Sequence, residues 1–167
     1  MSDHFVAILM GSDSDLPQMQ PAIDTLAKFD IRTEVKVTSA HRTPQATHGY
    51  VTTAEQRGCA VFIAGAGMAA HLAGAVAANT TKPVIGVPIN ASLEGLDSLL
   101  ATVQMPGGIP VATVAIGKAG AKNAAYLAAQ ILATADADLG ERVKAERAEN
   151  AKAVEAKDAA LQAKLAQ

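Results

Sequence analysis

The chain has 167 residues, of which 50% are hydrophobic and 18% are charged, a composition typical of one globular domain rather than of a disordered chain. The formal net charge is −2, and the 14 basic residues are spread along the sequence. Nucleic-acid binding needs a basic stripe that displaces counterions from phosphates. We therefore expect no nucleic-acid partner.

Targeting and redox signals are weak in this sequence. No basic segment precedes the first apolar run, which argues against a secretory signal peptide. Gly, Pro or polar residues interrupt every apolar run before it reaches the roughly 20 residues that a membrane span needs. The single cysteine, Cys59, cannot form an internal disulfide, and no Cys/His spacing resembles a zinc site. These features predict a soluble, cytoplasmic protein without a metal or a membrane partner.

Short apolar runs alternate with longer Ala-rich stretches along most of the chain. Candidate strands lie at residues 5–10, 33–38, 60–64, 83–87 and 111–116. The continuous apolar run at 5–10 is typical of a strand buried on both faces, whereas Val35 and Val37 alternate with polar residues in the second strand. Candidate helices lie near residues 14–28, 43–57, 68–79, 93–103 and 119–135. Pro21 should make the first helix start late or kink. This alternation predicts a three-layer, flavodoxin-like α/β fold with a doubly wound parallel sheet.

The composition changes at Asp136. Residues 136–167 are rich in Glu, Lys, Arg and Ala and carry a thin apolar seam. Opposite charges such as Glu141 and Lys144 recur at i,i+3 spacing, which favours a helix. We expect residues 1–135 to form a flavodoxin-like catalytic domain and residues 136–167 to form a charged helix. That helix is either a solvated end of the chain or an arm that packs on a neighbouring subunit.

Polar residues and glycines follow the predicted strands, where ligands bind in open parallel sheets. The segments are residues 11–15, 39–44, 65–71, 88–92 and 117–120. In the first segment, Gly-Ser-Asp-Ser-Asp, hydroxyl and backbone N–H groups at a helix N-terminus suit an anion, although the same residues also serve as simple helix caps. Both interpretations remain open at this stage.

Residues 39–44 read Ser-Ala-His-Arg-Thr-Pro. Arg42 can bind a phosphate through two parallel hydrogen bonds, and His41 suits proton transfer near neutral pH. Thr43 and Pro44 are typical of the N-cap and first position of a helix. An isolated histidine at a strand end can also be a packing or capping residue, so the pattern alone leaves both roles open.

Residues 65–70 match the loose dinucleotide pattern G-x-G-x-x-A, but no ribose-binding acid follows at the expected spacing. Close approach of the backbone to another ligand explains these glycines better. His71 is expected inside the following helix, as a ligand contact or as a structural residue. Residues 104–110, Gln-Met-Pro-Gly-Gly-Ile-Pro, either cover a site or form an ordinary crossover turn. His4 and His48 are expected at the surface, and Cys59 in the core.

Several longer motifs occur in a fixed order: GSDSD at 11–15, SAHRTP at 39–44, GAGMAAHLAG at 65–74, GVP at 86–88, LDSLL at 96–100 and VQMPGGIPVATVAIGKAGAKNAA at 103–125. Together they resemble the bacterial 5-(carboxyamino)imidazole ribonucleotide mutases, the class I members of the PurE family. The resemblance covers about residues 5–135, and SAHRTP is its most diagnostic piece.

The resemblance implies an isomerase of de novo purine (IMP) biosynthesis that needs no metal, biotin, ATP or nicotinamide cofactor. It would move a carboxylate from the exocyclic amine of 5-(carboxyamino)imidazole ribonucleotide to ring carbon 4, giving 4-carboxy-5-aminoimidazole ribonucleotide. In the family's mechanism the carboxylate leaves as trapped carbon dioxide, and carbon 4 is protonated before it captures the carbon dioxide. His41, as general acid/base, finally removes the carbon-4 proton.

The resemblance also implies substrate contacts and partners. The matching substrate-binding positions are Ser12, Asp15, Ser39, Arg42, Ala66, Gly67 and His71. Arg42 and Ser12 are expected on the phosphate, Asp15 on the ribose hydroxyls, and the residues near 66–71 on the base and carboxylate. The family further implies a homo-octamer with sites near subunit interfaces, and a 5-(carboxyamino)imidazole ribonucleotide synthetase as pathway neighbour.

The sequence differs from the family pattern at two positions, and three other functions compete with the mutase. The family loop usually reads GAGGAAHLPG, whereas this chain has Met68 and Ala73, and Met68 would be strained if its backbone needs a positive φ. Class II carboxylases, which use aminoimidazole ribonucleotide and carbon dioxide, typically have Lys where this chain has Arg42. A signalling receiver would need an aspartate after the third strand, where the chain has Gly-Ala-Gly. A ribonucleotide-binding module without turnover is the third alternative.

Overall fold

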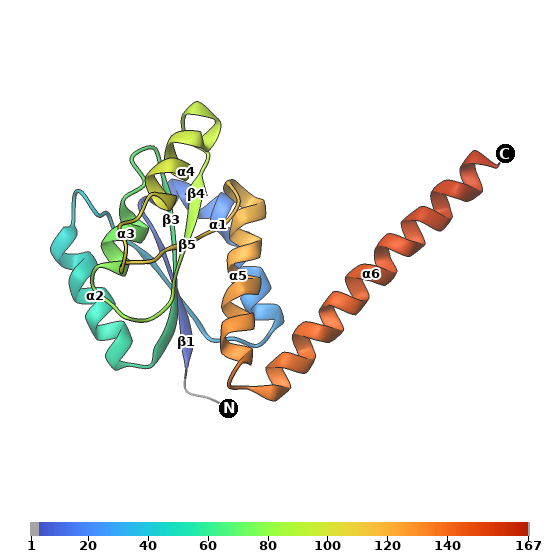
Figure 1. Cartoon of the computed structure of the whole chain (residues 1–167), viewed down its shortest axis with the longest axis horizontal. Helices are drawn as coiled ribbons and strands as arrows, with labels where there is room; N and C mark the ends of the chain where they lie inside the picture. The colour runs from blue at the N-terminus through green and yellow to red at the C-terminus, as the bar shows by residue number, and fades with distance from the viewer. Residues whose placement is uncertain (1–3, 167) are drawn as a thin grey trace. The chain divides into compact units, whose positions relative to one another are not determined.

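The computed structural model describes residues 4–166, which divide between Ala128 and Ala129 into two compact units. The first unit contains a five-stranded, all-parallel sheet of order β2-β1-β3-β4-β5. Its strands are β1 (Phe5–Met10), β2 (Thr33–Val37), β3 (Cys59–Gly67), β4 (Val84–Ile89) and β5 (Ala112–Thr113). Figure 1 shows α2 and α3 on one side of this sheet and α1 and α5 on the other. The predicted flavodoxin-like α/β fold is confirmed.

The helices follow the strands as the sequence pattern predicts. They are α1 (Leu16–Lys28), α2 (Pro44–Gln56), α3 (Leu72–Ala77), α4 (Leu96–Val103) and α5 (Gly117–Ala133), with single 3₁₀ turns at η1 (Asp13–Asp15) and η2 (Leu93–Gly95). Helix α1 does not start late, because it begins at Leu16 and runs through Pro21; a kink at Pro21 stays a prediction. The carbonyl that loses its helical donor there belongs to Pro17, which is exposed and therefore open to water.

Two predicted boundaries are wrong for local reasons. Strand β5 is only two residues long, because it is an edge strand that pairs regularly with β4 only at Ala112 and Thr113. Helix α3 begins at Leu72 instead of residue 68. Residues 68–71 instead form tight turns, in which the Ala70 N–H donates to the Met68 carbonyl and the His71 N–H to the Ala69 carbonyl, both at 2.8 Å.

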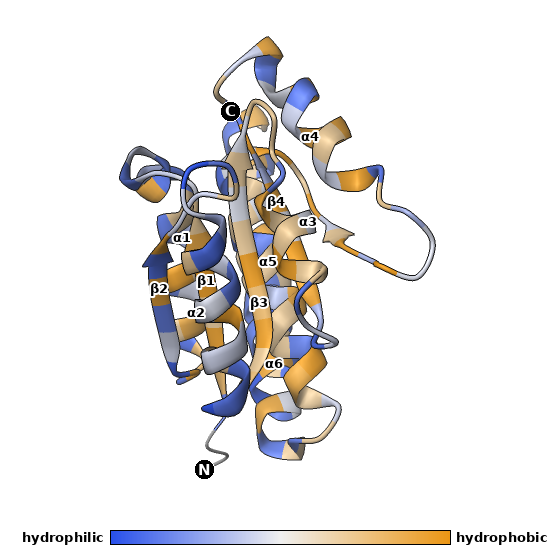
Figure 2. Cartoon of the chain, turned by 90° about the vertical axis from the view of Figure 1, so that its left-hand side faces the viewer, coloured by the Kyte–Doolittle hydropathy of each residue, from blue (hydrophilic) through white to orange (hydrophobic). Residues whose placement is uncertain are grey.

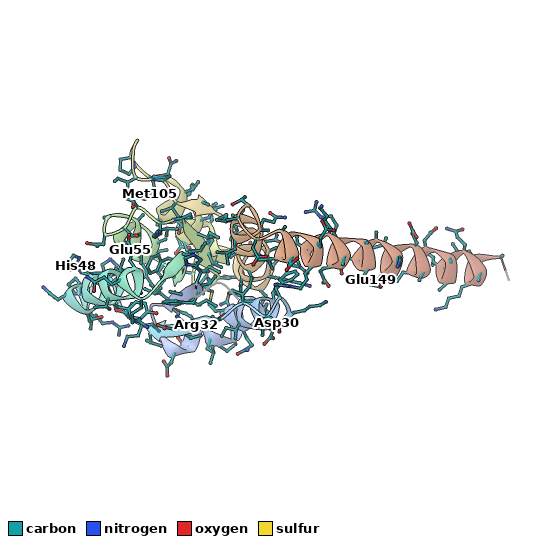
Figure 3. All side chains as sticks on the ribbon, turned by 90° about the horizontal axis from the view of Figure 1, so that it is seen from below. Asp30, Arg32, His48, Glu55, Met105 and Glu149 are labelled. Atoms are coloured by element: carbon teal, nitrogen blue, oxygen red, sulfur yellow. The ribbon has the colours of Figure 1, made fainter. Side chains whose placement is uncertain are left out.

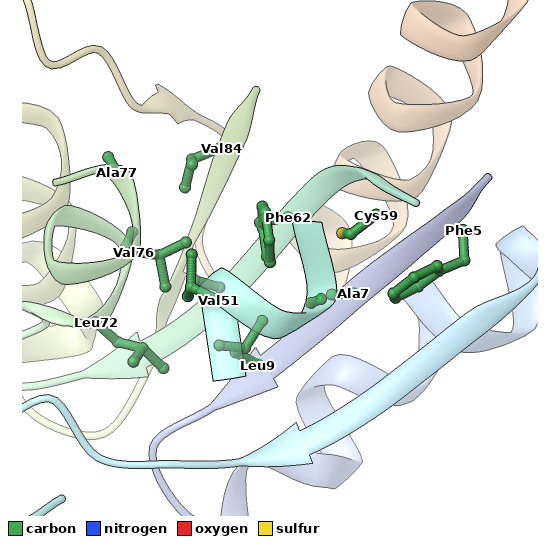
Figure 4. Packing of buried hydrophobic residues seen from close by; sticks show 13 residues of the cluster. Phe5, Ala7, Leu9, Val51, Cys59, Phe62, Leu72, Val76, Ala77 and Val84 are labelled. Carbon is green, nitrogen blue, oxygen red and sulfur yellow. The ribbon is translucent and has the colours of Figure 1, made fainter. Parts of the chain in front are cut away.

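The core on one face of the sheet is built from alternate residues of the central strands. Phe5, Ala7 and Leu9 of β1 lie beside Phe62 of β3, under Val51 of α2 and the apolar face of α3 (Figure 4). All six residues of β1 are buried, and β3 is drawn mainly in hydrophobic colours in Figure 2. Central strands buried on both faces hold the loops at their carboxyl ends on a rigid base.

The second unit contains the end of α5 and the long helix α6 (Ala137–Leu165). Asp136 is the N-cap, and its Oδ1 accepts a hydrogen bond from the Leu139 N–H at 3.0 Å. Exposed i,i+3 ion pairs join Lys144 to Glu141 and Lys152 to Glu149, the last labelled in Figure 3. Packing of this helix on a neighbouring subunit stays a prediction.

Candidate active site

A pocket of about 370 Å³ opens at the carboxyl edge of the sheet. Its lining residues come from the connections that follow β1, β2 and β3, from the end of β3 and from the start of α3. They are Gly11, Ser12, Asp15, Ser39, Ala40, His41, Arg42, Ala66, Gly67, Ala69, His71 and Leu72. The structure thus brings together all eight residues that the sequence singled out as catalytic or substrate-binding. It adds Gly11, Ala40, Ala69 and Leu72, which lie within the sequence motifs but have no predicted role of their own.

The loop after β1 is fixed by its own side chains. Ser12 is the N-cap of η1, where its Oγ accepts from the Ser14 N–H at 3.3 Å, while its own N–H donates to Oδ2 of Asp15 at 3.2 Å. This is a capping box, so the local interpretation of the motif and its place in the pocket are both correct. Burial raises the pKa of the Asp15 carboxyl, the hydrogen bond from the Ser12 N–H lowers it, and the nearby Asp13 charge raises it further.

The turn after β2 is held by Ser39 and Thr43. The Thr43 N–H donates to the Ser39 carbonyl at 2.9 Å, the Ser39 N–H donates to Oγ1 of Thr43 at 2.9 Å, and the Arg42 N–H donates to Oγ of Ser39 at 3.1 Å. Thr43 occupies the predicted N-cap position, with Pro44 first in α2, but its hydroxyl caps no helical N–H. The turn orients Arg42, whose guanidinium donates to the Gly11 carbonyl at 3.3 Å.

His41 and His71 form a hydrogen-bonded pair. Nε2 of His41 lies 2.7 Å from Nδ1 of His71, and the ring centroids are 4.8 Å apart at an angle of 80°. A hydrogen bond needs one donor and one acceptor, so one of these nitrogens carries a proton and the other offers a lone pair. The predicted place of His71 inside a helix is wrong. It is the N-cap residue of α3, which lets its ring reach the loop after β2.

The glycines at the end of β3 are required by packing as well as by the pocket. A Cβ on Gly65 would lie 2.5 Å from Sδ of Met19, and one on Gly67 would lie 2.8 Å from Cβ of Ala91. Gly67 therefore faces the pocket on one side and the loop after β4 on the other. Met68 follows with a φ of 54° and a side chain that is 60% exposed. The strained backbone that its sequence position suggested is present.

Comparison with known proteins agrees with this arrangement. The model of the family described as AIR carboxylase matches residues 5–153. The chain belongs to the AIR carboxylase family. Relatives called N5-carboxyaminoimidazole ribonucleotide mutase come from Bacillus subtilis, 57% identical over 148 residues (88% of this chain, 91% of the relative), and from Pyrococcus abyssi, 59% identical over 140 residues (83% and 79%).

One solved structure has a closely similar fold. The crystal structure of Treponema denticola PurE superposes with a TM-score of 0.84, covering 93% of this chain and 97% of that chain at 28% sequence identity. The Mycobacterium tuberculosis relative, also called N5-carboxyaminoimidazole ribonucleotide mutase, is 56% identical over 158 residues, which cover 94% of this chain and 90% of the relative. Members of the AIR carboxylase family thus match this chain along nearly its whole length.

The other residues that the sequence analysis considered lie outside the pocket. Residues 104–110 do not line the pocket; Sδ of Met105 lies beside Gly74 of α3, and Ile109 lines a separate cavity of about 490 Å³. His4 and His48 are exposed, as expected. Among residues 4–166, no group of three His, Cys, Asp or Glu residues is arranged to bind a metal ion. No helix in this described part is long and apolar enough to cross a membrane.

Proposed function

We propose that this chain is an N5-carboxyaminoimidazole ribonucleotide mutase of de novo purine biosynthesis, an isomerase that converts its substrate to 4-carboxy-5-aminoimidazole ribonucleotide. The observation that carries the proposal is that one pocket holds both a histidine pair and an arginine beside a Ser/Asp helix cap. The first part suits proton transfer and the second suits a ribonucleotide. Curated mutases more than 50% identical to the chain support the same substrate.

Substrate binding is proposed to use the loops after β1 and β2. Arg42, held against the Gly11 carbonyl, together with the Ser12 hydroxyl would bind the phosphate. Asp15 would accept hydrogen bonds from the ribose hydroxyls, which restore the solvation that burial takes from its carboxylate. Ser39 shapes this region through its hydrogen bond from the Arg42 N–H. The base and its carboxylate would then lie toward Ala66, Gly67 and His71.

The net reaction breaks one bond, forms another and moves one proton. The exocyclic N–C bond breaks and releases carbon dioxide, and the nitrogen gains a proton. Carbon 4 then bonds to the carbon dioxide and loses its hydrogen as a proton. His41 is proposed as the general acid/base for both proton steps, and His71, at 2.7 Å, offers the complementary donor or acceptor. No cofactor is required, because atoms and charges balance within the substrate and the histidine pair.

Carbon dioxide must stay at the site until it is recaptured, yet His41 and Arg42 are exposed. Helix α4 suggests what covers this edge. Its buried positions are Ser98 and Thr102, whereas its exposed face carries Leu96 (55% exposed), Leu100 (49%) and Val103 (47%) (Figure 2). An apolar stripe facing outward is typical of a protein interface. We propose a homo-oligomer, and the family resemblance favours an octamer, with a cytoplasmic location and the carboxyaminoimidazole ribonucleotide synthetase as pathway neighbour.

The direct test is interconversion of the two carboxylated isomers. Purified protein is incubated with 4-carboxy-5-aminoimidazole ribonucleotide, without added metal or nucleotide, and both isomers are followed by ¹³C NMR. We expect interconversion by the wild type and by His48→Asn, a control at an exposed histidine that bonds Asn79 away from the pocket. His41→Asn should lose turnover while still binding the ribonucleotide. A near-normal rate for His41→Asn would refute the assigned role.

The class II carboxylase reaction is the competing activity. Arg42 and the Gly-Ala-Gly run at 65–67 favour the mutase, as do the names of relatives that are 56–59% identical. The same preparation is therefore given aminoimidazole ribonucleotide and ¹³C-bicarbonate. Efficient incorporation of label at carbon 4, with no reaction of the carbamate isomer, would replace the proposed mutase by a carboxylase. Binding without reaction of either substrate would leave a ribonucleotide-binding module.

A further inference from the structure

The side chain of Gln18 joins two connections that are far apart in the sequence. Its Nε2 donates to the Asn90 carbonyl at 3.2 Å, and its Oε1 accepts from the Asn90 N–H at 3.3 Å, across 72 residues. A third connection meets them there, since a Cβ added to Gly117, which starts α5, would lie 3.1 Å from Oε1 of Gln18. One amide on α1 thus lies where the connections after β4 and β5 come together.

These two hydrogen bonds take the place of a missing strand. The pairing of β3 with β4 ends at Gly67 and Ile89, so Asn90 is the first residue beyond the sheet. Its N–H and carbonyl have lost their strand partner, and because Asn90 is exposed, bonding to water alone would leave the chain untied to the rest of the fold at this point. Gln18 supplies one acceptor and one donor in the arrangement that a neighbouring strand would offer. It therefore fixes where the chain leaves β4.

The position of Asn90 affects the pocket through its neighbour. Ala91 packs against the rear of Gly67, where even an added Cβ would be only 2.8 Å from Cβ of Ala91 and 3.3 Å from the Ile89 carbonyl oxygen. Gly67 itself lines the pocket. A shift of residues 90–91 would therefore press on Gly67 or leave a gap behind it, because close-packed contacts transmit displacement.

The segment after Asn90 is strained and needs such support. Leu93, Glu94 and Gly95 have φ values of 41°, 56° and 83°, which is costly for the two residues that have a Cβ. Oγ of the buried Ser98 bonds the Ile89 carbonyl at 2.9 Å and the Gly95 carbonyl at 2.8 Å, which closes the base of this loop. Gln18 holds the same loop from α1, three residues after Asp15.

We infer that Gln18 is a positioning residue for the site, which acts through Asn90 and Ala91 to hold Gly67 in place behind the substrate. This inference rests on the proposed mutase function. It also explains how one helix serves two sides of the pocket. The N-terminal end of α1 follows the Ser12–Asp15 cap, and the next turn carries the amide that fixes the loop behind Gly67.

The first test compares Gln18→Met, which keeps the side-chain length but removes both hydrogen bonds, with Gln20→Met. Gln20 is exposed on the same helix, and its side-chain amide donates to the Asp24 carboxylate at 2.8 Å. We expect kcat/KM of Gln18→Met to fall about tenfold, through both a lower kcat and a higher KM, because a displaced Gly67 disturbs the surface that binds and orients the substrate. Gln20→Met should match the wild type. A lower Tm of Gln18→Met with unchanged kcat/KM would overturn the inference.

The second variant, Gln18→Glu, separates the two hydrogen bonds. At neutral pH its carboxylate still accepts from the Asn90 N–H but opposes the Asn90 carbonyl, whereas the protonated acid can donate to that carbonyl. We therefore expect the activity of Gln18→Glu, relative to the wild type at each pH, to recover as the pH falls through the carboxyl pKa. A constant ratio across the pH range would count against the positioning role.

Hydrogen exchange tests the positioning role of Gln18 without a measurement of turnover. In Gln18→Met, amides of residues 89–95 should exchange faster than in the wild type or in Gln20→Met, and affinity for 4-carboxy-5-aminoimidazole ribonucleotide should fall. If the wild type does not interconvert the isomers, the proposed function fails, while exchange and affinity still decide the role of Gln18. Unchanged exchange at residues 89–95 together with unchanged affinity would exclude it.

Discussion

Nε2 of His41 lies 2.7 Å from Nδ1 of His71, although 30 residues separate them in the chain. They follow β2 and β3, which are not neighbours, because β1 lies between them in the sheet. The two histidine-bearing loops therefore flank the Ser12–Asp15 cap, which follows β1. The strand order that makes the sheet doubly wound is thus what places the histidine pair, proposed for proton transfer, next to a candidate phosphate site.

The first prediction concerns the partner of His41. His71→Phe keeps an aromatic ring for the edge-to-face contact but removes the hydrogen bond. Because His41 loses its donor or acceptor, and because His71 itself lies where the base and carboxylate are proposed to bind, we expect kcat to fall about a hundredfold and KM to rise. Steady-state kinetics measure both constants, with His48→Phe as the control at an exposed site.

A kcat near the wild-type value in His71→Phe would contradict the pair as a functional unit. Such a result would mean that His71 only fills space. His71→Asn gives a second check, because its amide can still donate or accept over a shorter reach. Activity of His71→Asn between that of His71→Phe and the wild type would support the hydrogen bond as the relevant contact.

Arg42→Lys tests the anion site. Lysine keeps the positive charge but loses the planar pair of N–H donors, so it binds a phosphate as a point charge. Since this contact is the same in the ground state and the transition state, KM should rise about tenfold while kcat stays near the wild-type value. Arg57→Lys is the matched control, because Arg57 pairs with Glu34 at an exposed site outside the pocket. An unchanged KM in Arg42→Lys would remove the phosphate role.

Substitutions of Met68 test whether its backbone is strained beside the pocket. Its φ of 54° favours glycine over any residue with a Cβ. Met68→Gly should therefore have a free energy of unfolding about 1 kcal/mol higher than Met68→Ala, as measured by urea denaturation. The order should reverse in the exposed middle of α6, where Ala151→Gly should lower stability. If Met68→Ala were the more stable of the pair, the left-handed conformation would be wrong.

Asp15 is expected to lower the stability of the protein at neutral pH while it contributes to substrate binding. Burial raises the pKa of its carboxyl above the ordinary value, so the folded chain binds this proton more tightly than the unfolded chain. Stability from this group is therefore complete below the ordinary pKa and is lost as the pH rises through the folded pKa. Asp15→Asn, which keeps an acceptor for the Ser12 N–H, should be more stable than the wild type at pH 7 and not at about pH 3.

The same substitution should weaken substrate binding although it stabilises the fold. If Asp15 accepts hydrogen bonds from ribose hydroxyls, Asp15→Asn should raise KM while it raises Tm at neutral pH. Asp24→Asn, at an exposed position of the same helix, should change neither. Loss of stability in Asp15→Asn at pH 7 would show that the capping hydrogen bond outweighs the burial of the charge.

The sequence allowed prediction of the strands and of the edge where the site lies, because both depend on local patterns. Continuous apolar runs locate buried strands, and the parallel-sheet rule places residues such as His41 and Gly67 at one edge. The start of α3 was predicted four residues too early, since Met68 adopts a left-handed conformation for which its residue type gives no signal. The error also put His71 inside a helix instead of at its cap.

Contacts between distant residues could not be predicted in the same way. The hydrogen bonds of Gln18 reach a residue 72 positions away, and a half-buried glutamine on a helix carries no local sign of such a partner. The bond between His41 and His71 depends on two loops adopting definite turns, one fixed by Ser39 and one by Met68. Residue types in the pocket followed from the sequence, whereas their partners required the fold.

The last prediction tests the assignment of Cys59 to the core. Its side chain is 1% exposed, and its Sγ donates to the Val61 carbonyl at 3.3 Å. Burial raises the pKa of the thiol to about 11, so almost no thiolate forms at pH 8, and the thiolate is the reactive species. Native protein should therefore not react with a disulfide reagent such as DTNB at pH 8, whereas protein in urea should react with one thiol per chain. Rapid reaction of the folded protein would show that the start of β3 opens well below the global free energy of unfolding.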